Sequence, residues 1–405
     1  MVSALPALAV TLAFLCAASW RSRYPPFLTL IGGALIFAVL TGAGTDAIAA
    51  FTRGAGAIFS LLAIPIFSGA VIAAVIRRNG GVERIISDIG RITRRPHLAA
   101  GVAGYLLSVP MMCCITPFIV LAPLLSHIRS EYRLSTRIFY VAATGSVISF
   151  VLLYPLPVAY AIVSGLDAVA SFDMPRYMLV AFPLSLLILA GATIALMSPE
   201  AGCCRPDTRN ETQTAPLRSG WLPVLLPIAL LIIGTTIPGL SFLANINLAL
   251  LAGLVAALAV CIPDDREEAA ASGTKNAGII LFDLCGAGGL GAVIAAQGGL
   301  TDLVVAHGHL LAPLLVPFLL AALLQASQGS RVVTAIVTTT ILAGTGIPAT
   351  VGILPFVLMT AAGTMVLSIF TDPYFWLIRR TTGDTVPDVL KQYTLPLTCA
   401  GLGVA

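Results

Sequence analysis

The amino-acid sequence predicts an all-α integral membrane protein built from two copies of one repeat, and three observations predict this fold class. Of the 405 residues, 58% are hydrophobic and only 10% are Asp, Glu, Lys or Arg, whereas about 25% of a soluble globular chain is charged. Apolar runs that approach the roughly 20 residues needed to cross a bilayer recur along the whole chain. One sequence pattern also returns at a fixed offset in the second half.

The apolar runs and their interruptions predict about ten transmembrane helices. No segment is long or polar enough to form a separate soluble domain. The first 20 residues contain no Lys or Arg and no cleavage site, so we interpret them as a retained first span. The expected spans lie near residues 4–20, 26–42, 56–76, 138–163, 176–197, 221–240, 244–262, 276–297, 350–371 and 386–404.

Two further apolar stretches, 97–128 and 309–346, are each too long for one simple span. Polar, Gly or Pro residues interrupt both, so we predict two re-entrant hairpins. Basic residues flank the first hairpin on both sides, which places its two ends in the cytoplasm by the positive-inside rule. The same rule applied along the chain places both termini outside and opens the second hairpin to the outside.

An internal repeat supports this layout. Ala74-Val75-Ile76, followed by Gly80-Gly81, recurs as Ala292-Val293-Ile294 followed by Gly298-Gly299, an offset of 218 residues. The same offset pairs the two hairpins and aligns Ala143, Gly145, Ser146 and Pro155 with Ala361, Gly363, Thr364 and Pro373. We therefore expect a first repeat over 1–198, a cytoplasmic linker over 199–219 and a second repeat over 220–405. Each copy has five spans, and because this number is odd the second copy starts on the opposite side of the membrane and is inverted. This is the inverted-repeat plan of many secondary transporters.

Other function classes find no support in the sequence. The formal charge of +4 is spread over short basic clusters between apolar runs, which reflects topology and not nucleic-acid binding. Most of the eight cysteines sit inside apolar stretches, so they form neither a disulfide framework nor a metal site. No HExxH, nucleophile elbow or P-loop is present. We expect no enzymatic activity, no cofactor and no bound metal.

The binding site is expected where breaks occur at matching places in the two halves, because unwound backbone survives in a membrane only inside protein or beside a water-filled cavity. Four stretches qualify: Ser108–Pro117, Thr144–Ser149, Gln325–Arg331 and Gly363–Asp372. Half-helix N-termini at such breaks present free N–H groups that suit an anion. The alternative is that Ser and Thr only form hydrogen bonds within their own helices. The candidate substrate-binding residues are Ser108, Thr116, Thr144, Ser146, Ser327, Gln328, Gly329, Ser330, Arg331, Thr364 and Ser368.

Arg331 and Asp372 are the charged residues inside these breaks. A guanidinium at the tip of a re-entrant hairpin costs a few kcal/mol at least and usually faces a cavity or a partner. Arg331 either holds a substrate carboxylate with two parallel hydrogen bonds or forms a structural ion pair with Asp372. Asp372, directly before Pro373, is either a proton carrier for coupling or a helix-end cap near the cytoplasm.

Sequence motifs from about residue 280 to 395 resemble the gluconate permease family of the ion transporter superfamily. They are Gly286-Ala287-Gly288-Gly289, Gln297-Gly298-Gly299, Gln328-Gly329-Ser330 with Val332, Val333 and Thr334, and Ser368–Trp376. Ile369 and Thr371 stand where the family has His and Asn, and Arg331 stands where it typically has a small residue. The segment Phe150–Pro157 keeps the family's prolines and lacks its histidines.

The resemblance implies a proton-coupled symporter that works by elevator-type alternating access. It also implies a homodimer whose chains cross the inner (cytoplasmic) membrane several times. The expected partners are the lipid bilayer, a small organic anion such as a carboxylate or sugar acid, and a proton or sodium ion. This chain lacks the polar His and Asn groups of the family and has Arg331 in addition. These differences favour an anion that is smaller or less hydroxylated than gluconate. The alternatives are a passive anion channel and a sodium-coupled carboxylate carrier, because Ser, Thr and carbonyl groups at the hairpin tips also suit sodium.

Overall fold

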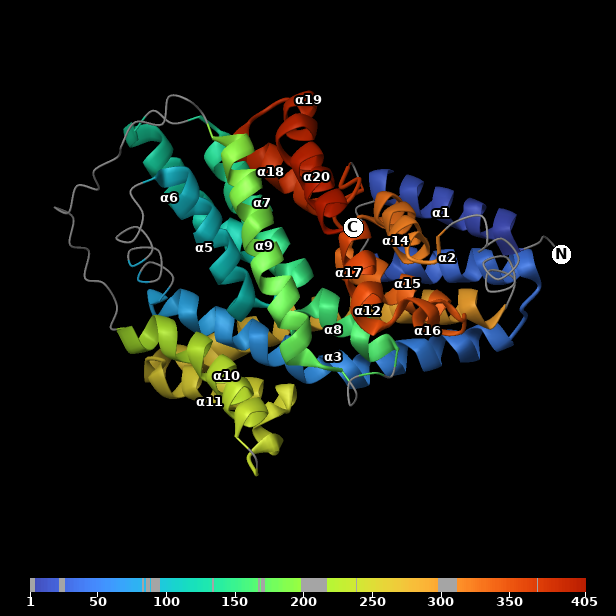
Figure 1. The fold of residues 1–405 in the computed structure, drawn as a ribbon, viewed down its shortest axis with the longest axis horizontal. Helices are drawn as coiled ribbons and strands as arrows, with labels where there is room; N and C mark the ends of the chain where they lie inside the picture. The colour runs from blue at the N-terminus through green and yellow to red at the C-terminus, as the bar shows by residue number, and fades with distance from the viewer. Residues whose placement is uncertain are drawn as a thin grey trace.

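The structure is a computed structural model, and it describes residues 4–21, 26–81, 84, 88, 95–132, 135–166, 168, 172–197, 217–237, 239–297, 312–369 and 371–405. Helices make up the described part of the chain, which contains no strand (Figure 1). The predicted all-α class is therefore confirmed. Most of the predicted linker, 199–219, lies outside the described residues.

The first half contains α1 (Ala4–Arg21), α2 (Pro26–Thr41), α3 (Asp46–Arg78), α5 (Pro96–Met111), α6 (Ile115–Tyr132), α7 (Arg137–Leu152), α8 (Pro157–Gly165) and α9 (Met174–Leu196). The second half contains α10 (Leu217–Thr236), η1 (Ser241–Ala244), α11 (Ile246–Val260), η2 (Pro263–Asp265), α12 (Arg266–Ala296), α14 (Leu315–Gln328), α15 (Arg331–Ala343), α16 (Ile347–Val351), α17 (Ile353–Gly363), α18 (Pro373–Thr382), α19 (Val386–Val389), a π-helical turn η3 (Leu390–Thr394) and α20 (Leu395–Val404).

Local sequence explains where several helices begin. Proline occupies the first turn of α5, α8, α9 and α18, where its missing N–H is not needed. Asp173 accepts a hydrogen bond from the Arg176 N–H at the start of α9 (3.0 Å), and Asn245 caps α11 in the same way. At the other end, Gly329 terminates α14 with a left-handed φ of 72°.

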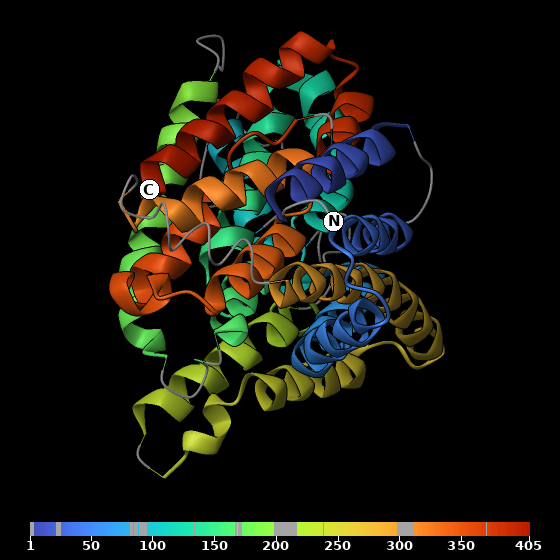
Figure 2. The same cartoon turned by 90° about the vertical axis from the view of Figure 1, so that its right-hand side faces the viewer.

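The two longest helices, α3 and α12, cross the molecule side by side (Figures 1 and 2). Gly54 and Gly288 allow this approach, because a Cβ on either residue would collide with the backbone of the other. The two parts of α3, 46–60 and 62–78, are bent by 49°. Pro65 explains the bend, since its ring clashes with the carbonyl of the residue four positions earlier.

Both stretches predicted as hairpins are pairs of short helices joined by a tight turn. The helices α5 and α6 are separated by residues 112–114, where Met112 has a φ of 47°. The helices α14 and α15 are separated only by Gly329 and Ser330. The helix–turn–helix form agrees with the expected hairpins, whereas their re-entrant placement in a membrane stays a prediction.

Two predicted spans are interrupted. The span expected over 138–163 consists of α7 and α8 with a break at 153–156, and the peptide bond before Pro155 is cis. The span expected over 350–371 ends at Gly363, and the described residues between there and Pro373 are not helical. In both cases a proline starts the following helix. The break at 363–372 agrees with the predicted Gly363–Asp372 break, whereas the one at 153–156 was not predicted.

Length and hydropathy alone qualify three described helices to cross a membrane: Arg137–Gly165, Met174–Leu196 and Pro263–Ala296. The bent pair that forms α3 raises the number to four, and the other apolar helices found among the described residues are 10–17 residues long. The expected number of about ten spans therefore stays a prediction.

Equivalent helices in the two halves keep the repeat offset. The bounds of α3 and α12 differ by 220 and 218 residues, and those of α5 and α14 by 219 and 217. The aligned glycines make matching contacts: a Cβ at Gly145 of α7 would collide with the Gly101 carbonyl of α5, and one at Gly363 of α17 with the Phe318 carbonyl of α14. The inverted orientation of the halves stays a prediction.

Candidate functional site

The candidate site centres on Arg331, the first residue of α15, whose side chain is 97% buried. Its Nη2 atom donates hydrogen bonds to Ser368 Oγ (2.9 Å), Asp372 Oδ2 (3.0 Å) and Tyr393 Oη (2.8 Å). The Nε atom is buried and, within the described part of the chain, has no hydrogen-bond partner. The Nη2 atom is thus engaged, whereas the Nε donor is left without an acceptor among the described residues.

Asp372 is the counter-charge, and its side chain is 1% exposed. Its Oδ2 accepts hydrogen bonds from Arg331 and from the Tyr393 hydroxyl (3.1 Å), and its Oδ1 accepts one from the Tyr374 N–H (2.9 Å). Asp372 is therefore both the N-cap of α18 and the partner of Arg331. The structural ion pair that the sequence left open is present, and removing either charge would leave the other buried and uncompensated.

The first half of the chain contacts this network at Tyr374, a residue of α18 in the second half. The Tyr374 hydroxyl lies 3.0 Å from Ser146 Oγ on α7, and its ring packs edge-on against Tyr393 at 5.6 Å between centroids. Ser108 on α5 donates to the Ser146 carbonyl (2.8 Å) and to the Cys113 carbonyl (2.9 Å). The buried Cys114 thiol, in the turn between α5 and α6, is close enough to interact electrostatically with Arg331 and Asp372. The turns of both helix pairs thus converge on one place.

Gly329 fixes the second turn against the site. A Cβ at this position would overlap the carbonyl of Thr371 and the nitrogen of Asp372. Thr371 in turn donates from its hydroxyl to the Ala326 carbonyl of α14 (2.9 Å). The peptide that carries Asp372 therefore rests directly on the α14–α15 turn.

The remaining predicted residues are less closely connected to the charges. The hydroxyls of Ser327 and Thr364 donate to carbonyls of the preceding turn, Leu324 (2.8 Å) and Ala361 (2.7 Å). This agrees with the alternative that Ser and Thr only form hydrogen bonds within their own helices. Ser330 is the N-cap of α15 and is half-buried, Gln328 ends α14, and Thr116 lies half-buried in the first turn of α6.

The predicted break over Thr144–Ser149 is wrong. These residues lie inside α7 and are buried, and the break of this segment falls later, at 153–156. Thr144 and Ser146 resemble break residues because their hydroxyls interrupt an apolar run, but a buried helix can also carry hydroxyls. The Thr144 hydroxyl has no hydrogen-bond partner among the described residues.

Tyr374 and Tyr393 are site residues that the sequence prediction missed. Tyr393 lies in the π-helical turn η3, and both side chains are fully buried. An aromatic residue in an apolar run gives no polarity signal. The usable signal was that a buried tyrosine hydroxyl needs a partner, and that π-helical turns often occur at functional sites.

Further buried polar groups lie on α14, α15 and α17. Thr334 donates to Gln325 Oε1 (3.0 Å), which leaves the Gln325 amide nitrogen without a partner among the described residues. The hydroxyls of Thr338, Thr339 and Thr360 are likewise buried and unpaired within that part of the chain. Buried polar groups are normally satisfied, so these unpaired groups are free to bind water or a polar ligand. In the described part of the chain, no cluster of His, Cys, Asp or Glu could hold a metal ion.

Solved structures with the same fold are transporters. The chain is similar to the YdaH transporter of Alcanivorax borkumensis, with a TM-score of 0.63 and 15% identity, covering 94% of this chain and 97% of that one. It is also similar to MtrF of Neisseria gonorrhoeae, with a TM-score of 0.58 and 12% identity over 96% of each chain. These two likenesses show the fold of the chain.

The chain belongs to the GntP permease family, whose model matches residues 3–404. It is 26% identical to a gluconate permease of Zymomonas mobilis, covering 97% of this chain and 94% of that protein. It is 25% identical to the D-serine transporter DsdX of Escherichia coli, covering 92% and 90%. The resemblance to gluconate permeases is confirmed as that of a distant member, and the chain is a permease and not an enzyme.

Proposed function

We propose that this permease is a secondary active transporter of a small organic anion, that the anion's carboxylate binds at Arg331, and that transport is coupled to a proton on Asp372. The buried Arg331–Asp372–Tyr393–Ser368 network carries this proposal, because it places one cation and one anion where two turns and a broken helix meet. Relatives named as gluconate permeases and D-serine transporters support a small carboxylate-bearing substrate.

The coupling follows from charge balance. The empty site holds one positive and one negative charge, so it is neutral. A carboxylate that displaced Asp372 from Arg331 would leave the site with a net negative charge, and an uncompensated buried charge costs several kcal/mol. Protonation of Asp372 removes that cost and releases Arg331 for two parallel hydrogen bonds to the substrate. One proton therefore accompanies one monovalent anion, and the loaded site is neutral again.

Asp372 is the carboxylic acid of this network. Besides Arg331, the titratable groups that face this network are the phenols of Tyr374 and Tyr393 and the thiols of Cys113 and Cys114. Groups of these types have ordinary pKa values of about 8.5 to 10 and are neutral at pH 7. The carboxylate is the group whose protonation changes the charge balance of the pair.

The finer architecture is part of the same proposal. Matching helix bounds and matching glycine contacts support two inverted repeats with two re-entrant hairpins, a membrane-embedded site and elevator-type movement in the inner membrane. Membership of the ion transporter superfamily and a homodimer accompany this proposal. A sodium-coupled carrier or a passive channel would need a different source of charge balance, and the experiment below separates them.

The test is uptake of gluconate and smaller monocarboxylates into proteoliposomes under separately imposed gradients. We expect a pH gradient, alkaline inside, to drive accumulation above the external concentration, whereas a sodium gradient or a membrane potential alone does not. Accumulation driven by sodium would assign the alternative coupling ion. Uptake that only reaches equilibrium under every gradient would contradict coupled transport and favour a channel.

Asp372→Asn provides the sharpest variant. Asn is about as good an N-cap as Asp, so α18 keeps its start, and the neutral amide imitates the protonated carboxyl. We expect the variant to carry the anion without a proton, so that its uptake no longer responds to the pH gradient and becomes driven by an inside-positive potential. Uptake that remains driven by the pH gradient would exclude Asp372 as the proton carrier.

A further inference from the structure

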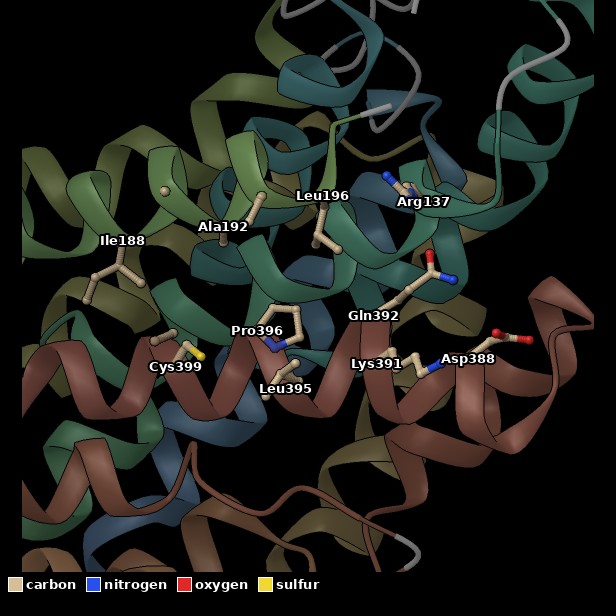
Figure 3. Close-up of a pocket in the computed structure, with 13 residues that line it drawn as sticks. Arg137, Ile188, Ala192, Leu196, Asp388, Lys391, Gln392, Leu395, Pro396 and Cys399 are labelled. Atoms are coloured by element: carbon tan, nitrogen blue, oxygen red, sulfur yellow. The ribbon is translucent and has the colours of Figure 1, made fainter. Parts of the chain in front are cut away.

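A groove lies between the second half of α9 and the segment 388–400, which runs from the end of α19 through η3 into α20 (Figure 3). Its volume is about 640 Å³, within the roughly 300–1,000 Å³ of small-molecule sites. The proposed transport mechanism uses none of the residues that line it.

The lining of the groove is amphipathic along its length. Arg137, Asp388, Lys391 and Gln392 gather at one end, and Ile188, Ala192 and Cys399 line the other (Figure 3). The apolar wall belongs to α9, one of the described helices that can span a membrane by itself. A ligand that fills this groove therefore has a polar head at one end and an apolar chain along the other.

The polar end offers positive charge that is not neutralised. Asp388 accepts a hydrogen bond from the Thr385 hydroxyl of its own helix start (2.5 Å). Neither Arg137 nor Lys391 has a carboxylate within ion-pair distance in the described part of the chain, and Arg137 makes only a long hydrogen bond to the Met197 carbonyl (3.4 Å). The buried Gln392 Oε1 also lacks a partner there.

We infer that this groove binds an anionic phospholipid, with the phosphate at Arg137 and Lys391 and an acyl chain between α9 and α20. The positive-inside rule predicts that both cations lie on the cytoplasmic side, where the membrane surface is negative, and basic pockets between transmembrane helices hold anionic headgroups there. Each cation near such a headgroup is expected to strengthen binding about fivefold. Because Asp388 lies at the same end and offsets one of the two cations, the net positive charge favours an anionic over a zwitterionic lipid by about fivefold.

The groove is adjacent to the transport site in sequence. Lys391 and Gln392 line the groove, and the next residue in the same π-helical turn, Tyr393, contacts Arg331 and Asp372. Substitutions in the groove therefore have to be conservative, so that binding of lipid is measured on a folded protein.

The experiment titrates the full-length protein in neutral detergent with phosphatidylglycerol, phosphatidylcholine of the same chains, and glycerol phosphate as the soluble headgroup. Native mass spectrometry counts bound molecules, and thermal denaturation reports stabilisation. We expect phosphatidylglycerol to bind about fivefold more tightly than phosphatidylcholine, and glycerol phosphate to give no stabilisation. Equal binding of the two lipids, or equal stabilisation by glycerol phosphate, would overturn the proposal.

The variant Arg137→Gln/Lys391→Gln removes the two cations while keeping long polar side chains. It should lose the preference for phosphatidylglycerol, whereas Arg379→Gln/Arg380→Gln, which removes two cations outside the groove lining, should keep it. A groove variant that keeps the preference would contradict the assignment. So would a spontaneous disulfide between Cys399 residues of two copies, because it would place the groove at a subunit interface.

Discussion

At the scale of single residues, the buried ion pair of Arg331 and Asp372 determines what the site can do. The three hydrogen bonds that Arg331 donates through Nη2 and its unpaired Nε show that the guanidinium is held in place without being saturated. This unpaired donor is where the proposed ligand carboxylate would bind.

The first prediction concerns the cost of separating the pair. We expect Arg331→Met to lower the free energy of unfolding by about 3–5 kcal/mol, because it leaves Asp372 buried without a counter-charge. The double variant Arg331→Met/Asp372→Asn should recover most of this loss, since it buries no charge. Denaturation of the purified proteins in one detergent measures both. A single variant as stable as the double would mean that Asp372 is not held in a buried ion pair.

The second prediction concerns Gly329. Its φ of 72° and its contact with the Thr371–Asp372 peptide leave no room for a Cβ. We expect Gly329→Ala to displace Asp372 and to lower the initial rate of anion uptake at least about tenfold, the effect of about 1.4 kcal/mol on the site.

Gly344→Ala is the matched control, because no atom lies within 4 Å of a Cβ at that position and its φ is −78°. It should transport normally. Equal uptake by the Gly329 and Gly344 variants would show that the α14–α15 turn does not support the site.

At the scale of helices, the glycines of the repeat set how closely the broken helices approach the helix pairs. Gly145 and Gly363 occupy aligned positions, and each lets its helix touch a carbonyl of α5 or α14. The alignment therefore has a physical cause, because any larger residue would push the helices apart in either half.

We predict that Gly145→Ala and Gly363→Ala each destabilise the protein by about 1–3 kcal/mol, the usual cost of overpacking a tight contact. Gly278→Ala on α12 has open space and should instead be neutral or stabilising by about 0.5–1 kcal/mol. Thermal denaturation in detergent compares the three. Equal midpoints would show that these helix crossings tolerate a methyl group.

At the scale of the whole molecule, the proposed inverted topology places the loop after α15 and the end of α18 on opposite sides of the membrane. Gly346 has open space around it, and Arg380 is exposed. We expect a membrane-impermeant maleimide added to intact cells to label Gly346→Cys and not Arg380→Cys. The unsubstituted protein serves as the control for its own cysteines. Labelling of both variants or of Arg380→Cys alone would contradict the inverted arrangement.

The sequence predicted local features well. Its low charge and recurrent apolar runs indicated a helical membrane protein, and the glycine and proline breaks at 108–117, 325–331 and 363–372 contain the turns and unwound segments that the structure shows. The prediction failed at Thr144–Ser149, where hydroxyl groups inside a buried helix were interpreted as a break. Hydropathy does not distinguish a hydroxyl that interrupts a helix from one that the helix buries.

The sequence by itself determined the membrane class and the presence of one cation and one anion within predicted breaks, because composition and helix-breaking residues act locally along the chain. Only the tertiary structure decided that Arg331 meets Asp372, 41 residues away, and that Tyr393 bridges them. It also decided that Ser146 of the first half meets Tyr374 of the second. Such contacts depend on how closely helices from distant parts of the chain pack together. Glycines at the helix crossings permit this close packing, but no local sequence pattern shows which helices will meet.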